Sequence, residues 1–229
     1  MKRFYTRAAA VPGPGGVAIQ LDGRPVKTPA RSALQVPTEE LAEAIATEWN
    51  GQGEEIDPRS MPLTGLANAA IDRVSPDPGG FAAGLARYGE SDLLYYRAEG
   101  PRPLVERQSA QWAPLLAWAG TRYGVEFEVT EGVMHRAQAP ATVERLGRAA
   151  AAREPFQLAA LSPLVTVSGS LSVALALAEG AVGLEPAWAA AQLDEDWQAE
   201  QWGADPLAEA ARAERRRDFE AAYRFLTLL

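Results

Sequence analysis

The first 36 residues show short runs of alternating apolar and polar positions, a pattern typical of β-strands. An Asp22-Gly23 pair separates two of these runs, and Asp-Gly between extended segments is a strong signal for a β-hairpin. We therefore expect strands in four runs, which read FYTRAAAV, GVAIQL, RPVKTP and ALQV. The sequence predicts a β-rich N-terminal region.

After Pro37 the apolar residues recur at helical spacing, and residues that favour helix ends separate the segments. Thr38, followed by two glutamates, predicts an N-cap for a helix that ends near Asn50, and Ser60 predicts the cap of the next one. Further helices are expected over residues 77–88, 104–123, 140–153, 155–167, 171–179 and 186–202 and from residue 206, with a short strand near 126–130. These elements predict an α+β protein, with a small N-terminal β-rich domain over residues 1–55 packed against a larger all-helical domain over residues 56–229.

Charge and composition exclude several classes of function. The 229 residues contain 30 acidic and 22 basic side chains, a net charge of −8, so we expect no nucleic-acid partner. The longest apolar tract, residues 163–178, is shorter than the roughly 20 residues that span a bilayer, so we expect no membrane insertion. With no cysteine and the single His135, neither a metal site nor a catalytic triad is indicated, and no phosphate loop is present. We therefore expect no metal, no cofactor and no catalytic residue.

The segment LDEDWQAEQWG near the C-terminus carries the most chemistry. Asp194, Glu195 and Asp196 surround Trp197 and lead to Trp202. Paired carboxylates can act as acid and base in glycoside hydrolysis, but neighbours on one helix do not face each other across a cleft. The same acids suit the capture of an Arg or Lys on a partner, with tryptophan excluding water. A merely solvated acidic face is the third interpretation.

Trp49 is a second candidate for partner binding. It closes the predicted helix that follows Thr38, within the block TEWNGQGEEIDP. A tryptophan in this position could anchor the core or present an exposed aromatic ring to a partner. The sequence leaves both interpretations open.

Several blocks of the chain resemble the assembly chaperones of the F1-ATPase α subunit, which occur in mitochondria and in some bacteria. They are the TEWNGQGEEIDP block, MPLTGLANAAIDRV, DLLYYRAEGP with Gln108, WAPLLAWA and LDEDWQAEQWG. The resemblance implies a protein without enzymatic activity that holds the unassembled α subunit, and prevents its aggregation, until a β subunit replaces it.

The resemblance also implies a site and a location. Acids in the LDEDWQAEQWG block are regarded as functional in that family, which points to Asp194, Glu195, Trp197, Trp202 and Trp49 as partner-binding residues. Asp194 stands where mitochondrial members commonly have Glu, so the choice between Asp194 and Glu195 stays open. We expect a monomer in the bacterial cytoplasm. A hydrolase that uses carboxylate pairs and a small structural adaptor are the alternatives.

Overall fold

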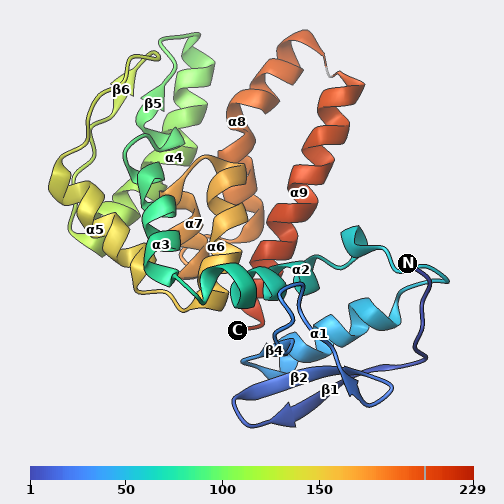
Figure 1. Cartoon of the computed structure of the whole chain (residues 1–229). Helices are drawn as coiled ribbons and strands as arrows, with labels where there is room; N and C mark the ends of the chain where they lie inside the picture. Colours follow the sequence, from blue (N-terminus) through green and yellow to red (C-terminus); the bar gives the residue numbers. More distant parts are fainter. Residues whose placement is uncertain (204) are drawn as a thin grey trace. The chain divides into compact units, whose positions relative to one another are not determined.

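The structure is a computed structural model that describes residues 1–203 and 205–229. It confirms the expected α+β class, with strands near the N-terminus followed by helices (Figure 1). Contacts divide the chain into two compact units. Unit 1 comprises residues 1–78, 154–160 and 224–229, and unit 2 comprises residues 79–153 and 161–223. The expectation that residues 1–55 form a separate domain stays a prediction.

The sheet of unit 1 is antiparallel and is built on its second strand. Its strands are β1 (Ala8–Gly13), β2 (Gly16–Leu21), β3 (Arg24–Pro25) and β4 (Gln35–Val36). Strand β2 pairs with all three others. Asp22 and Gly23 both have positive φ, as the tight turn from β2 to β3 requires, so the hairpin expected there is confirmed.

Helix α1 (Glu39–Asn50) packs against this sheet and closes the core of unit 1. The Thr38 side chain accepts a hydrogen bond from the amide of Leu41, which confirms the predicted cap. Leu41 and Ile45 from the helix and Ile19 from β2 are fully buried in one apolar cluster. The alternation of the strands and the helical spacing after Thr38 thus bury one common face.

The next helix begins differently from the expectation. Ser60 does not cap it: a 3-10 turn (Pro58–Ser60) comes first, and α2 (Pro62–Ala69) starts after Met61, which supplies no side-chain hydrogen bond. The cap comes from Glu48 on α1, whose carboxylate accepts from the amides of Leu63 at 2.7 Å and Thr64 at 2.8 Å. The Thr64 hydroxyl donates to the same carboxylate at 2.7 Å. A π-helical turn (Ala70–Val74) continues α2.

Unit 2 is helical and is built around a short, fully buried helix. Helix α7 (Leu171–Ala178) contacts α4 (Arg102–Tyr123), α5 (Pro140–Ala151) and α8 (Leu184–Trp202). Two strands, β5 (Tyr96–Arg97) and β6 (Thr130–Glu131), form a parallel pair. The other elements are α3 (Pro78–Ala86), the 3-10 turns Arg87–Gly89 and Leu93–Tyr95, and the larger parts of α6 (Pro155–Ser168) and α9 (Pro206–Thr227), whose residues 155–160 and 224–227 belong to unit 1. The helices expected after residue 77 are therefore all present, within a few residues of the expected bounds.

Asp92 fixes the start of α7 from within the core of unit 2. Its side chain is fully buried, and its carboxylate accepts from the amides of Leu94 at 3.0 Å and Ser172 at 2.9 Å. Burial raises the pKa of Asp92 above its usual range, because desolvation outweighs these hydrogen bonds. The carboxyl group joins the 3-10 turn before β5 to the first turn of α7.

Replacing Glu48 with Ala should destabilise the fold, because the amides of Leu63 and Thr64 would lose their acceptor. We expect the free energy of unfolding to fall by about 2–3 kcal/mol, measured by urea denaturation. Glu43→Ala is the matched control, because Glu43 is exposed on the same helix. Equal stability of the two variants would contradict the assignment of Glu48 as the cap of α2.

Glu48 should also make stability depend on pH. Its pKa is raised because desolvation outweighs the hydrogen bonds from Thr64 and Leu63. Between the unfolded-state pKa and the raised folded-state pKa the native state binds more protons, so the free energy of unfolding falls as pH rises through this window. Glu48→Gln should remove that decline, whereas Glu43→Gln should retain it. Urea denaturation at a series of pH values from about 4 to 7 measures the slope, and an unchanged slope in Glu48→Gln would refute the expectation.

Candidate functional site

The residues predicted for partner binding fall in both units. Asp194, Glu195, Trp197 and Trp202 lie on the C-terminal half of α8, in unit 2. Asp194 and Trp197 are half-buried, Glu195 is exposed, and Trp202 is 78% exposed. Trp49 lies at the end of α1, in unit 1. The structure therefore gathers four of the five predicted residues on one helix.

Asp194 is bound to the interior of unit 2 through Gln108 on α4. Gln108 is buried, and its Nε2 donates to the Asp194 carboxylate at 2.8 Å. The Oε1 of the same amide accepts from the backbone amide of Ala98, which follows β5, at 2.8 Å. Asp194 therefore has a structural role, because it completes the hydrogen bonds of a buried amide.

Arg97 supplies a positive charge to this cluster. Its guanidinium donates to the backbone carbonyl of Gln108 at 2.9 Å and lies 5.0 Å from the ring centroid of Trp112. Desolvation lowers the pKa of Arg97, and the charge of Asp194 opposes that shift. The Trp112 Nε1 donates to the carbonyl of Ala190 on α8 at 2.8 Å. Arg97 thus joins β5 to α4, and two hydrogen bonds, one buried and one partly buried, join α4 to α8.

The other acids of α8 are paired with arginines of the same unit. Glu195 and Asp196 bind Arg215 and Arg212 of α9, each at 2.5 Å. Glu200 binds Arg107 of α4 at 2.7 Å, and this hydrogen bond lowers the pKa of Glu200. The Arg107 guanidinium lies 5.0 Å from the ring centroid of Trp197. A partner cation would therefore have to exchange with an internal arginine at each of these acids.

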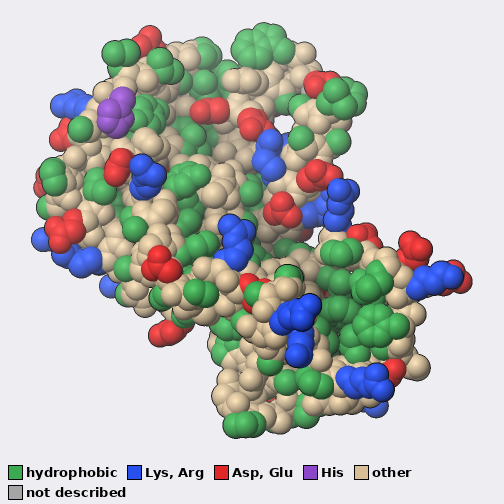
Figure 2. Space-filling view, viewed as in Figure 1, with side chains coloured by type: hydrophobic (Ala, Val, Ile, Leu, Met, Phe, Trp, Pro, Cys, Tyr) green, Lys and Arg blue, Asp and Glu red, His purple; other side chains and the backbone are tan. Residues whose placement is uncertain are grey.

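Large exposed apolar side chains mark one end of unit 2. The described residues include seven of them, and the five in unit 2 lie either within residues 129–134 or at the end of α8 (Trp202) and the start of α9 (Leu207). Val133 is 93% exposed, Met134 77% and Leu207 80%. We call Val129, Val133, Met134, Trp202 and Leu207 the apolar end. Figure 2 shows green side chains along this part of unit 2.

The polar cluster explains why residues 129–134 lie at the same end of unit 2 as the end of α8 and the start of α9. The amide of Gly132 donates to the carbonyl of Arg97, which places the connection after β6 beside β5. Gln108 ties the residue after β5 to Asp194, and Arg107 ties the start of α4 to Glu200, near the end of α8. In Figure 1 this end of unit 2 is at the top, where β5, β6, the C-terminal end of α8 and the N-terminal end of α9 lie.

Sequence reasoning found one residue of the apolar end and missed the other four. Trp202 was among the predicted residues, but Val129, Val133, Met134 and Leu207 were not. The signal was present in the sequence, because Val133 and Met134 follow Gly132 between a predicted strand and a predicted helix. Two large apolar residues in such a connection have no helical or strand face to join, and this favours exposure.

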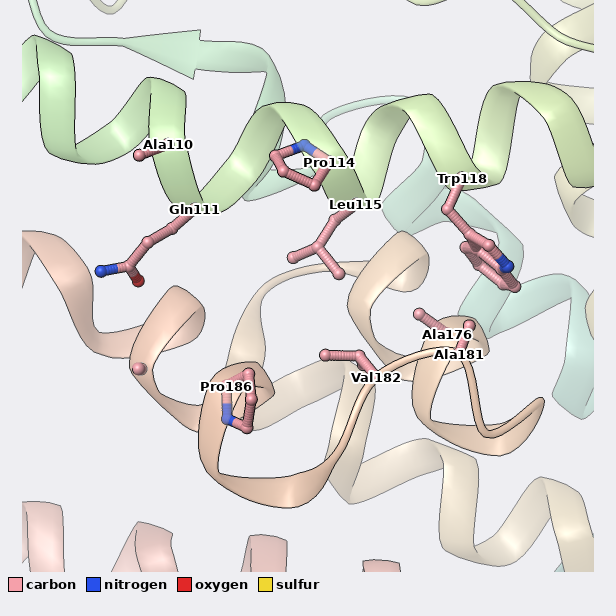
Figure 3. Close-up of a pocket in the computed structure, with 10 residues that line it drawn as sticks. Ala110, Gln111, Pro114, Leu115, Trp118, Ala176, Ala181, Val182 and Pro186 are labelled. Carbon is pink, nitrogen blue, oxygen red and sulfur yellow. The ribbon is translucent and has the colours of Figure 1, made fainter.

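An apolar groove lies elsewhere in unit 2, with a volume of about 360 Å³. Figure 3 shows Pro114, Leu115 and Trp118 of α4 on one side and Val182 and Pro186 on the other. Its lining contains no acid, no base and no histidine, so it offers no group for acid–base or nucleophilic chemistry. Among the residues that the structure describes, no group of three His, Cys, Asp or Glu side chains could hold a metal ion.

Trp49 is part of the packing of unit 1. Its ring packs edge-on against the Tyr5 ring, with 5.7 Å between the ring centroids, and its backbone carbonyl accepts a hydrogen bond from the Tyr5 hydroxyl at 2.6 Å. The side chain is half-buried, and its Nε1 has no acceptor within the part of the chain that the structure describes. The two interpretations of Trp49 are therefore compatible, because one ring face packs while the residue also lines a surface cleft.

Comparison with known proteins gives consistent matches over most of the chain. A model of the ATP12 chaperone protein family matches residues 2–120, more than half of the chain. The mitochondrial protein atp12 of Schizosaccharomyces pombe is 29% identical over 214 residues, which cover 88% of this chain and 74% of that protein. The crystal structure of Atp12 from Paracoccus denitrificans matches with a TM-score of 0.94 and 42% identity, over 99% of this chain and 97% of the other. An aspartate-to-lysine mutant of the Paracoccus protein matches with the same values.

Charge reversal should separate the two neighbouring acids of α8. Asp194→Lys would leave the buried Gln108 amide without its acceptor and bring a second cation near Arg97, so we expect a loss of about 2–3 kcal/mol in the free energy of unfolding. Glu195→Lys removes an exposed ion pair and should lose less than about 1 kcal/mol. Urea denaturation measures both values. Equal stability of the two variants would show that Asp194 has no structural role.

Proposed function

The chain belongs to the ATP12 chaperone protein family, and from this premise we propose that it binds the unassembled α subunit of the F1-ATPase. In this proposal it prevents aggregation of the α subunit until a β subunit replaces it. Two observations support the proposal: the sequence blocks that resemble chaperones of this subunit and the apolar end of unit 2. The family is one of chaperones, which removes the support for a hydrolase.

The apolar end has the chemistry that a holding chaperone needs. A subunit awaiting assembly exposes the apolar surface that its partner will later cover, and such surfaces aggregate in water. The exposed side chains of Val133 and Met134 in one segment, and of Trp202 and Leu207 at two helix ends, can cover part of that surface. Because these side chains lie on separate segments, the contact they offer is one that the β subunit can displace in steps.

The ion pairs beside the apolar end supply orientation. Glu195 is 57% exposed in its pair with Arg215, and Arg107 is 35% exposed in its pair with Glu200. Such surface pairs contribute about 0–1 kcal/mol to the fold, so a client charge can replace either partner at little cost. Charged rims fix the register of a complex and accelerate encounter more than they add affinity. We therefore assign Glu195, Trp197 and Trp202 to client contact and Asp194 to positioning of α8.

Further parts of the proposal concern stoichiometry and location. We infer a monomer that binds one client, in which the apolar end is covered by the client and not by a second copy. The relatives include a mitochondrial protein and a bacterial one. No helix of the described residues is both long and apolar enough to cross a bilayer. We place this chain in the bacterial cytoplasm, where the F1 sector is assembled.

The client proposal is tested by removing the apolar end. Met134→Ser with Trp202→Ser should lower the amount of soluble F1 α subunit on co-expression by about tenfold or more, because interface hot spots of large apolar side chains contribute about 2 kcal/mol each. The measurement is the α subunit that remains soluble and co-purifies with the tagged chaperone.

The matched control is Arg217→Ser, which removes a large exposed side chain from α9 away from the apolar end. It should retain the α subunit as the wild type does. Melting temperatures of both variants should stay near the wild-type value, because the substituted side chains are exposed. Full retention of the α subunit by the double variant would remove the apolar end from the proposal, and no retention by the wild type would remove the client.

A further inference from the structure

Unit 1 contains a cleft that the apolar end does not account for. It has a volume of about 620 Å³ and lies between the N-terminal segment, the turn from β2 to β3 and the end of α1. Its apolar lining includes Phe4, Tyr5, Leu21, Val26 and Trp49. Phe4 is 67% exposed and Met1, at the same cleft, is 74% exposed. These two are the only large exposed apolar side chains among the described residues of unit 1.

The polar groups left free in this cleft are donors. Arg24 and Lys27 line it and are exposed, and neither forms a salt bridge with a described residue, although the charge of Arg24 helps to lower the pKa of Asp22. The Trp49 Nε1 also lacks an acceptor among the described residues, but it is buried and does not reach the cleft surface.

The acceptors of the cleft are already occupied. Asp22, the acid in its lining, accepts from the backbone amides of Arg7 and Thr6 with its two carboxylate oxygens, each at 2.9 Å. These two hydrogen bonds hold the pKa of Asp22 below its usual value. The hydroxyl of Tyr5 donates to the Trp49 carbonyl. A ligand that enters the cleft therefore meets apolar surface and the cationic side chains of Arg24 and Lys27.

The charge of the cleft is opposite to that of the whole chain. The chain has a net charge of −8, yet the side chains that line this cleft include two cations, Arg24 and Lys27, against one carboxylate, Asp22. Figure 2 shows a green patch beside the N-terminal segment, with both blue and red side chains on its borders. An acidic ligand is the complement of such a surface, because unpaired cations beside apolar area attract a carboxylate and exclude a basic group.

We propose that this cleft binds a peptide segment of the client protein in which a bulky apolar side chain lies next to one or two carboxylates. The apolar side chain packs against Phe4 and Trp49, and the carboxylates bind Arg24 and Lys27. The proposal rests on the proposed chaperone function and adds a second contact, which differs from the apolar end in selecting for negative charge. It gives Trp49 a role in client binding that its packing against Tyr5 leaves intact.

A labelled peptide tests the chemistry of the cleft. The probe is a fluorescein-labelled peptide with Leu-Phe flanked by glutamates, and its two controls carry glutamine or lysine in place of glutamate. Fluorescence anisotropy with the full chain should show binding of the glutamate peptide at least about tenfold tighter than that of the glutamine peptide and no binding of the lysine peptide. Raising the salt concentration from about 50 to about 500 mM should weaken the binding.

Variants assign the binding to the cleft. Arg24→Glu with Lys27→Glu should weaken binding of the glutamate peptide by about tenfold or more. Arg87→Glu with Arg217→Glu makes the same change of charge on exposed residues of unit 2 and should bind as the wild type does. The indole proton resonance of Trp49, identified by its loss in Trp49→Phe, should shift on binding. Equal affinity for the glutamate and glutamine peptides, or unchanged binding after the reversal at Arg24 and Lys27, overturns the proposal.

A crosslink tests whether the occupant is the client. With p-benzoylphenylalanine in place of Phe4, irradiation of the complex with the F1 α subunit should join this position to an acidic, apolar segment of the subunit, identified by mass spectrometry. A retained subunit that gives no crosslink, or one to a basic segment, overturns the proposal and leaves the proposed function standing. If the wild type retains no α subunit, the proposed function fails, and the peptide measurements still decide whether the cleft binds acidic, apolar segments.

Discussion

The apolar end of unit 2 depends on the buried side-chain amide of Gln108. A primary amide has one acceptor and one donor group, and in Gln108 each is used on a different element: the oxygen accepts from Ala98 after β5, and the nitrogen donates to Asp194 on α8. Because an unpaired amide inside a protein costs about 1–3 kcal/mol, both partners are held in place. The chain segments that carry the exposed apolar side chains are attached to these two partners, so one amide sets the end of the unit at which both appear.

In the same region, exposed apolar side chains lie beside charged side chains that are paired with one another. Exposed apolar side chains supply surface that water disfavours, whereas the acids and arginines around them are already paired with one another. A surface of this composition is sticky toward an unfinished interface and carries little local net charge. The basic cleft of unit 1 has the opposite character, with free cations and occupied acceptors. Two such surfaces on one chain would recognise different parts of a client.

Hydrogen bonds between side chains and backbone groups stabilise unit 1. The Glu48 carboxylate caps α2, the Asn50 amide both accepts from and donates to the backbone of Ala8 at the start of β1, and Gln52 accepts from the amide of Asp57. All three belong to the same block as Trp49, so that block builds the wall of the cleft as well as part of the core. A substitution at Trp49 would therefore disturb the packing of unit 1 together with the proposed client contact, while the side chains of Arg24 and Lys27 can be changed without touching the core.

The sequence by itself determined the features whose interactions are local. Asp22 and Gly23 adopt the turn that their own backbone preferences favour. Thr38 caps α1 by accepting from the amide three residues ahead, and helical spacing located the helices of unit 2. It also indicated the family, because the blocks that carry the resemblance are continuous in the chain. Tertiary structure alone decided the cap of α2 and the partner of Gln108. In each case the interacting groups lie far apart in the chain, 15 residues for Glu48 with Leu63 and 86 for Gln108 with Asp194. Hydrophobic periodicity predicts which face of an element is buried, but the element that covers this face is chosen by packing, and the polar partners follow from that choice.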